Sequence, residues 1–301
     1  PDTGFRLTTE ALDAAVAGIL RAVAARYGLD DVVSIVFGRG AALELVTDPD
    51  VQAVGFTGSE TVGRMLMDRA AARESPIPVY AEMGSLNPLV VSPEACRRVD
   101  IASTLSDSVL LGAGQFCTKP GIIFLPEGPD GDRVVLEMTE ALAQAAPMFL
   151  LSSAIRESFV NNAQNVAAVK NGDGLVLPKA GVGSAVTAAL SSVSSADLWN
   201  APALITECFG PGALLVRYAS TAEVTEALLN IPPSLTLSLF AEPGERAFAA
   251  DLVRIAEDRV GRIIFGAVPT GVAVTWSQNH AGPYPASAGG MFTSVGATAV
   301  R

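Results

Sequence analysis

Hydrophobic and polar positions along the first 84 residues follow two patterns in turn, helical spacing and short apolar runs. From Thr8 to Tyr27 the apolar residues fall three or four positions apart, which predicts an amphipathic helix that ends at Gly28. Short apolar runs rich in β-branched residues predict strands, and helical spacing between them predicts short helices. The predicted strands are 31–38, 51–58 and 77–83, and the helices between them are 41–46 and 59–72. Such alternation is typical of a parallel sheet covered by helices.

The alternation continues beyond Gly84 with longer segments, which predicts an α/β protein with a domain boundary near this glycine. Apolar runs predict strands at 87–92, 122–125, 175–177, 213–218, 235–241 and 261–265. Helical spacing predicts helices at 97–111, 134–146, 153–169, 222–230 and 247–260. The run of small residues at 181–196 fits neither pattern.

Composition narrows the class of protein. Half of the 301 residues are hydrophobic and 17% are charged, which is enough to bury a core and excludes intrinsic disorder. The formal net charge of -11, with no cluster of Lys or Arg, argues against nucleic-acid binding. Three cysteines in so long a chain do not form a disulfide framework, so we expect a reducing, cytoplasmic location. The uncharged stretch Ile263–Val300 holds too many glycines and prolines to cross a membrane as a helix, and the N-terminus lacks a signal-peptide pattern.

The three cysteines are candidates for a reactive thiol. Cys117 lies in GQFCT, a glycine-containing turn between a predicted helix and a predicted strand, where a substrate could approach a thiolate. A buried cysteine that acts as a small hydrophobe explains this position equally well. Cys96 has two arginines beside it, but it begins a charged helix without a glycine-rich approach, which favours a structural or exposed thiol. Cys208 precedes a Gly-Pro turn and could lie beside a site.

Carboxylates and one glycine-rich turn add further candidates. Glu82 ends a predicted strand, where partial desolvation would suit a general base, although a solvated strand-end glutamate fits as well. Glu207 allows the same two interpretations. The turn GFTGS at 55–59 joins a strand to a helix whose first N–H groups could receive a pyrophosphate, but its spacing is not GxGxxG. The single histidine, His280, lies in a Gly/Pro-rich loop, which favours a structural role, so we expect a carboxylate base and no metal site.

Four motifs occur in a fixed order along the chain. They are GFTGS at 55–59, AEMGSLNP at 81–88, GQFCT at 114–118 and ECFGP at 207–211, with Glu82 and Cys117 separated by 35 residues. Together these motifs resemble the aldehyde dehydrogenase superfamily. The segment Glu82-Met83-Gly84-Ser85, the run GQFCTKPG and the closing HAGPYPAS resemble its α-ketoglutaric semialdehyde (2,5-dioxopentanoate) dehydrogenase branch.

The resemblance implies a covalent mechanism. Cys117 would attack an aldehyde to give a thiohemiacetal, hydride transfer to NAD or NADP would leave a thioester, and Glu82 would activate the water that hydrolyses it. The residues implied to contact the cofactor are Gly55, Ser59, Glu207 and Phe209. The implied substrate is α-ketoglutaric semialdehyde, oxidised to 2-oxoglutarate, and the full-length parent is implied to be a homo-oligomer.

The resemblance also implies an aldehyde-dehydrogenase-like fold of two domains and a C-terminal segment. The domains are a partial Rossmann-like dinucleotide-binding domain over 1–84 and an α/β catalytic domain over 85–283. The segment over 284–301 returns to the cofactor domain.

The chain departs from the family in length. Members are considerably longer, and two of their upstream residues have no counterpart here: an Asn that donates to the oxyanion and a Lys that contacts the adenosine ribose. We therefore expect either a fragment of a longer product or a chain that is not a competent enzyme by itself, with apolar faces left uncovered. Two alternatives stay open, namely a non-catalytic remnant that serves as an interaction module and a cysteine acyl transferase or esterase that needs no cofactor.

Overall fold

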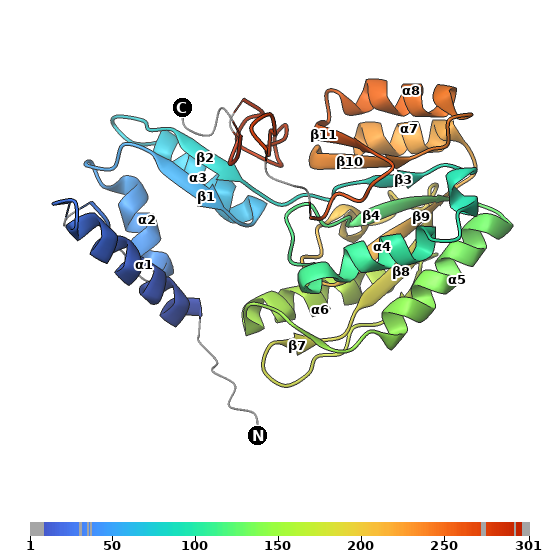
Figure 1. The fold of residues 1–301 in the computed structure, drawn as a ribbon, viewed down its shortest axis with the longest axis horizontal. Coiled ribbons are helices and arrows are strands. Elements are labelled where there is room, and N and C mark those ends of the chain that lie inside the picture. The colour runs from blue at the N-terminus through green and yellow to red at the C-terminus, as the bar shows by residue number, and fades with distance from the viewer. Residues whose placement is uncertain are drawn as a thin grey trace. The chain divides into compact units, whose positions relative to one another are not determined.

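The computed structural model describes residues 9–29, 32–34, 36, 38–271, 275–291 and 293–296. The chain forms two compact units (Figure 1). The smaller unit comprises Pro1–Val54 and Arg64–Val79, and the larger unit comprises Gly55–Gly63 and Tyr80–Arg301.

Helices dominate the smaller unit. Helix α1 (Thr9–Ala25) confirms the first predicted helix, and Gly28 lies just beyond it with a left-handed φ of 69°. Helix α2 (Arg39–Thr47) confirms the second. The Arg73 guanidinium donates to the Val51 carbonyl at 2.9 Å and to the Val46 carbonyl at 3.3 Å, which ties the end of α2 to the segment that follows α3 (Glu60–Ala71).

The strand predicted at 31–38 is wrong for the residues that the structure describes in that range, 32–34, 36 and 38, none of which is in a strand. A short β-branched run needs a partner strand to satisfy its backbone, and pattern alone does not supply one. The next two predicted strands are confirmed in shorter form. They are β1 (Val54–Thr57) and β2 (Val79–Glu82), which pair in a two-stranded sheet.

A seven-stranded sheet forms the centre of the larger unit, in the order β11-β10-β3-β4-β9-β8-β6. Neighbouring strands are parallel except for the edge pair β6 and β8. The strands are β3 (Leu89–Val91), β4 (Ile122–Pro126), β6 (Asp173–Val176), β8 (Ala189–Ser194), β9 (Gly212–Tyr218), β10 (Ser234–Phe240) and β11 (Val260–Phe265). Six of these were predicted from their apolar runs, and β8 lies in the run that fitted neither pattern.

Helices cover both faces of this sheet (Figure 1). Leu89 and Ile123 belong to a core cluster with α4 (Ile101–Leu110) and α5 (Pro129–Gln144), whereas their neighbours Val90 and Phe124 belong to a second cluster with α7 (Thr221–Asn230) and α8 (Arg246–Ala256). Side chains that alternate between two buried faces explain why these strands are apolar throughout. The five helices predicted beyond Gly84 are confirmed.

Local signals fix where the helices begin. The Ser152 hydroxyl accepts the Ile155 amide at the start of α6 (Ser153–Ala167), and Ser220 does the same for α7. Pro129 occupies the first turn of α5. A short antiparallel pair, β5 (Met148–Phe149) and β7 (Ala185–Val186), lies beside the sheet, and three 3-10 turns complete the described elements: η1 (Ala95–Arg97), η2 (Leu111–Gly114) and η3 (Pro202–Ile205).

Several loops meet at the amino-terminal edge of the parallel strands. The motif loops at 114–118 and 207–211 lead into the neighbouring strands β4 and β9. The loop that contains His280 passes the start of β11, since a Cβ on Gly261 would lie 1.6 Å from the Ala281 carbonyl oxygen. Residues 286–288 return along β2, where the Met83 amide donates to the Ala286 carbonyl at 2.8 Å. Segments far apart in the sequence therefore surround one point, next to Glu82.

Candidate active site

A series of left-handed residues places Cys117. Gly112, Ala113 and Gly114 have φ values of 58°, 58° and 66°, so the chain turns sharply after α4 before it enters β4. A Cβ on Gly114 would lie 2.1 Å from the Gly210 carbonyl oxygen, and only glycine allows this approach of the two motif loops. The thiol of Cys117 is partly buried and faces polar groups, which favours the reactive interpretation over that of a small hydrophobe.

Two buried polar side chains hold the cysteine loop. The Asn87 amide donates to the carbonyls of Cys117 at 2.8 Å and Lys119 at 3.0 Å. The Lys119 ammonium group donates to the carbonyls of Cys208 at 3.1 Å and Gly212 at 2.7 Å, and its burial lowers its pKa. These bonds connect the two motif loops, although sequence reasoning assigned a role to neither Asn87 nor Lys119.

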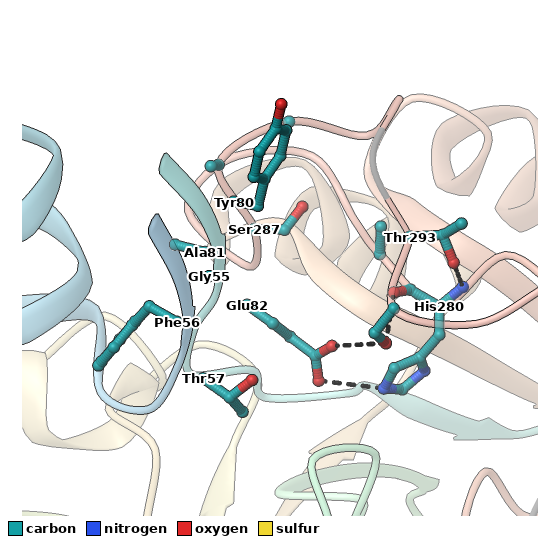
Figure 2. Close-up of a pocket in the computed structure, with 13 residues that line it drawn as sticks. Gly55, Phe56, Thr57, Tyr80, Ala81, Glu82, His280, Ser287 and Thr293 are labelled. Carbon is teal, nitrogen blue, oxygen red and sulfur yellow. Dashed lines mark hydrogen bonds and ion pairs between the residues drawn. The ribbon is translucent and has the colours of Figure 1, made fainter. Parts of the chain in front are cut away.

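The structure brings Cys117, Glu82 and His280 into direct contact. The Cys117 Sγ lies 3.1 Å from His280 Nε2, and the same nitrogen lies 3.0 Å from Glu82 Oε1. Figure 2 shows the Glu82 and His280 side chains pointing toward each other. The Ser294 hydroxyl donates to the other Glu82 oxygen at 3.2 Å. Sequence reasoning expected a structural His280, and the one available signal was that this is the only histidine of the chain.

The contacts shift the proton affinities of the acid and the imidazole in opposite directions. Burial raises the pKa of the Glu82 carboxyl, but the hydrogen bonds from His280 and Ser294 and the charge of His280 outweigh it, so the pKa lies below 4.5. Hydrogen bonds to Cys117 and Glu82 raise the pKa of His280 to about 9, against the effect of burial. The Arg262 guanidinium lies 3.4 Å from Nδ1 on the other side of the ring, and burial lowers its pKa.

The cluster differs from a hydrolase triad. In a triad the imidazole contacts the nucleophile through one nitrogen and the carboxylate through the other. Here one nitrogen of His280 contacts both Cys117 and Glu82, while Nδ1 faces Arg262. A proton relay from thiol through imidazole to carboxylate is therefore not built into this arrangement.

The same three side chains offer one sulfur, one nitrogen and one oxygen within 4.8 Å of one another. Tetrahedral zinc would hold such atoms about 3.3–3.6 Å apart. The contacts of 3.1 and 3.0 Å through Nε2 are shorter and match hydrogen bonds. We therefore interpret the cluster as hydrogen-bonded.

A cavity of about 500 Å³ contains most of the residues singled out from the sequence. Cys117 and Glu82 line it together with Ser59, Glu207 and Phe209. Gly55 does not; it lines a second cavity of about 380 Å³, which it shares with Glu82 and His280 (Figure 2). Glu82 is therefore accessible from two sides.

Glu207 is the more deeply buried of the two carboxylates. Burial raises its pKa, opposed by the charge of Lys119 and by the Ser85 backbone amide. A Cβ on Gly84 would lie 2.5 Å from a Glu207 carboxylate oxygen, so this glycine leaves the space that the acid occupies.

The other two cysteines are less reactive. Cys96 is fully buried, and burial raises its pKa to about 11, despite the opposing charges of Arg133 and Arg217. Burial also raises the pKa of Cys208. All three cysteines are free thiols, and Cys117 is the one that contacts an acid and an imidazole.

An α/β fold with a cysteine and a carboxylate that line one cavity, and a histidine in contact with both, defines a candidate enzyme with a thiol nucleophile. Residues 9–261 match the model of the aldehyde dehydrogenase family, and the chain belongs to that family. It is 37% identical over 293 residues to alpha-ketoglutaric semialdehyde dehydrogenase 2 of Azospirillum brasilense, a match over 94% of this chain and 55% of that protein. It is 32% identical to an alpha-ketoglutaric semialdehyde dehydrogenase of Acinetobacter baylyi, over 89% of this chain and 52% of the relative. The chain thus spans about half the length of these curated relatives.

Solved structures confirm the predicted α/β, aldehyde-dehydrogenase-like fold. A variant of Bradyrhizobium japonicum proline utilization A matches 93% of this chain with 28% of its own length, at a TM-score of 0.73 and 22% identity. Aldehyde dehydrogenase 21 from Physcomitrella patens matches 83% of this chain with 51% of its own, at a TM-score of 0.66 and 19% identity. Among the described residues, no helix combines the length and apolarity needed to cross a bilayer.

Proposed function

We propose that the chain carries the catalytic centre of an NAD(P)-dependent aldehyde dehydrogenase. The favoured substrate is α-ketoglutaric semialdehyde, which would be oxidised to 2-oxoglutarate. The observation that carries the proposal is the contact of the Cys117 thiol with a polar cluster that contains Glu82, beside a cavity that both residues line. The names of the two bacterial relatives support the choice of substrate.

Cys117 and Glu82 divide the reaction between them. The Cys117 thiolate attacks the aldehyde carbon, and its backbone N–H donates to the oxygen that becomes negative. Once the carbon is oxidised to a thioester, Glu82 takes a proton from water, and the resulting hydroxide attacks the thioester carbon. The C–S bond then breaks, the acid product leaves, and Cys117 is again a thiolate. The low pKa of Glu82 keeps it deprotonated and able to accept that proton.

The donor groups around the larger cavity fit a dinucleotide cofactor. Ser59 precedes α3, whose first N–H groups have no partner within the helix and favour a phosphate. The buried Glu207 carboxylate can accept ribose hydroxyls, and Phe209 offers an aromatic face. When bound, the nicotinamide would accept the hydride from the substrate carbon. Gly55 lines the other cavity. As a glycine it could contact the cofactor only through its backbone.

A second candidate is a cysteine esterase or acyl transferase that uses no cofactor. The 3.1 Å contact between Cys117 and His280 favours it, because acyl transfer needs an ionised thiol and no hydride acceptor. The match of residues 9–261 to the aldehyde dehydrogenase family argues against it. The domain boundaries at 84 and 283, the cytoplasmic location and the homo-oligomeric parent belong to the aldehyde dehydrogenase proposal and not to this second candidate.

The test uses the full chain with α-ketoglutaric semialdehyde and either NAD or NADP. Cofactor reduction is followed as the increase in absorbance of the NADH or NADPH that forms. We expect no product from Cys117→Ala. In Glu82→Gln we expect one rapid turnover followed by steady turnover at least about 100-fold slower, because hydrolysis of the thioester loses its base. The control Glu74→Gln removes an exposed carboxylate from the smaller unit and should behave like the unaltered chain.

Two outcomes would overturn the proposal. One is equal activity in the unaltered chain and in Cys117→Ala. The other is hydrolysis of p-nitrophenyl acetate by Cys117 without any cofactor reduction, which would select the esterase instead.

A further inference from the structure

Two acceptors compete for one nitrogen in the candidate active site. Cys117 Sγ and Glu82 Oε1 lie 3.1 and 3.0 Å from the same His280 Nε2, and an imidazole nitrogen carries at most one proton. The His280 and Glu82 side chains are each 13% exposed, so little water is present to take the place of either contact. The position of that single proton therefore decides the charge of both partners.

Two anions so close together need a cation. The Cys117 sulfur and a Glu82 carboxylate oxygen lie within 4.8 Å of each other, a distance at which a thiolate and a carboxylate repel each other strongly in a partly buried site. Without a positive charge between them, the thiol would keep its proton while Glu82 is ionised. A protonated His280 removes this conflict, because it attracts both anions from one point.

Three ionisable side chains from three segments face the His280 ring. Cys117 from the loop before β4 and Glu82 from β2 both favour the imidazolium. Arg262 from β11 opposes it, since a guanidinium 3.4 Å from Nδ1 disfavours a second ring proton. The two shorter hydrogen bonds, to Cys117 and Glu82, outweigh the guanidinium, and they raise the pKa of His280 to about 9.

The backbone of His280 is also fixed. Its amide donates to the Thr293 hydroxyl at 2.7 Å, and Thr293 in turn donates to the Val295 carbonyl at 2.7 Å. Ser294 donates to Glu82, so the same loop segment contacts both the histidine and the acid. The position of His280 therefore does not depend only on the two contacts that its ring makes with Cys117 and Glu82.

We propose that His280 is a catalytic residue that ionises Cys117: the Sγ–H bond of the cysteine breaks, an Nε2–H bond forms, and the resulting imidazolium is shared by the thiolate and the Glu82 carboxylate. The proposal rests on the proposed function only in taking Cys117 as the nucleophile. It assigns the activation of the thiol to a residue other than the acid that later activates water. No co-reactant is required, because the proton moves between two groups of this chain.

The test measures the ionisation of the thiol without aldehyde or cofactor. The full chain is treated with iodoacetamide between pH 5 and pH 10, and alkylation of the Cys117 peptide is followed by mass spectrometry, which separates it from Cys96 and Cys208. At pH 6.5 we expect His280→Gln to react at least about tenfold more slowly than the unaltered chain, because glutamine cannot hold a cation beside the thiolate. At pH 10 the two rates should converge, since the thiol then ionises without help.

Controls separate this role from a structural one. Asn279→Ala removes a neighbouring, exposed side chain whose amide donates to the Gly290 carbonyl at 3.5 Å, and its profile should match the unaltered chain. Adding imidazole to His280→Ala should restore part of the rate at pH 6.5. A rate that is lowered equally at every pH, or a profile that is unchanged in His280→Gln, would overturn the proposal.

The two proposals can fail separately. Loss of cofactor reduction with an intact pH profile would leave the role of His280 in place and remove the dehydrogenase. Normal cofactor reduction with a profile that ignores His280 would do the reverse.

Discussion

Asn87 connects three segments at the candidate active site. Its amide donates to the Cys117 and Lys119 carbonyls, and its oxygen accepts from the hydroxyls of Ser85 at 2.8 Å and Thr236 at 3.2 Å. The side chain is 1% exposed, so water cannot replace these bonds. A buried amide whose donors and acceptor are all used holds the loop that carries the nucleophile.

Replacing Asn87 by alanine should lower the free energy of unfolding by at least about 3 kcal/mol, because several buried groups lose their partners. Asn171 is the matched control. It also has a left-handed backbone, with φ of 65° against 47° for Asn87, but its amide makes an exposed hydrogen bond, to Asp197. Asn171→Ala should cost only about 1 kcal/mol, mainly from the backbone. Urea titrations compare the two variants, and equal losses would show that the amide bonds of Asn87 contribute nothing.

Single residues of the site could be predicted where a local motif surrounds them. Cys117, Glu82, Ser59 and Phe209 were found in this way, and the structure brings them to one cavity. His280 could not be found, because 163 residues separate it from Cys117 and only the return of the chain past β11 brings the two together. Its Gly/Pro-rich loop gave no periodic signal that would place its side chain.

At the level of elements, the two motif loops are joined by a close backbone contact. Gly114 has φ of 66°, and a Cβ there would lie 2.1 Å from the Gly210 oxygen and 2.6 Å from the Pro211 nitrogen. Both neighbours are backbone atoms, so neither can move aside without shifting the loop that carries Glu207 and Phe209. The position of Cys117 in the cavity wall therefore depends on Gly114, three residues before it.

Gly114→Ala should reduce the free energy of unfolding by about 2–5 kcal/mol and lower the alkylation rate of Cys117 at every pH. Gly183 is the control, since its φ of 65° is nearly the same but nothing lies within 4 Å of a Cβ there. Gly183→Ala should cost about 1 kcal/mol, the cost of the backbone conformation alone. Thermal or urea unfolding gives both values. If the two variants lost the same stability, the close approach of the loops would have no energetic weight.

Elements were predictable from the sequence where both faces of a strand are buried. All seven residues of β10 and all five of β4 are buried, and their large apolar residues gave the right boundaries within two residues. Strand β8 was missed because its sequence, ALSSVS, contains mostly small residues and has too little bulk to signal a strand. The segment 31–38 shows the opposite error, a strand-like sequence whose described residues are not in a strand.

The whole molecule shows two levels of burial. In the larger unit, α5 presents Val134, Met138 and Leu142 to the sheet, and these side chains are at most 1% exposed. In the smaller unit, the apolar side chains of α1 whose burial the structure describes are mostly uncovered, with Ile19 at 65% and Leu20 at 51% exposure. The sequence pattern of α1 predicted the helix correctly. Pattern cannot by itself say whether a stripe has a partner.

Hydrogen exchange should therefore distinguish helix α1 from helix α5 and strand β10. Helices α1 and α5 have similar lengths, 17 and 16 residues, but only α5 has a buried apolar face. Because helical stability in proteins comes mainly from packing of such a face, α1 should open locally while α5 opens only with its unit. We expect the amides of α1 to exchange at least about 100-fold faster than those of α5 and β10 at the same pH. The measurement is exchange followed by mass spectrometry of peptides from each element, with amide rates corrected for local sequence. Equal protection of α1 and α5 would mean that the stripe of α1 is covered in solution.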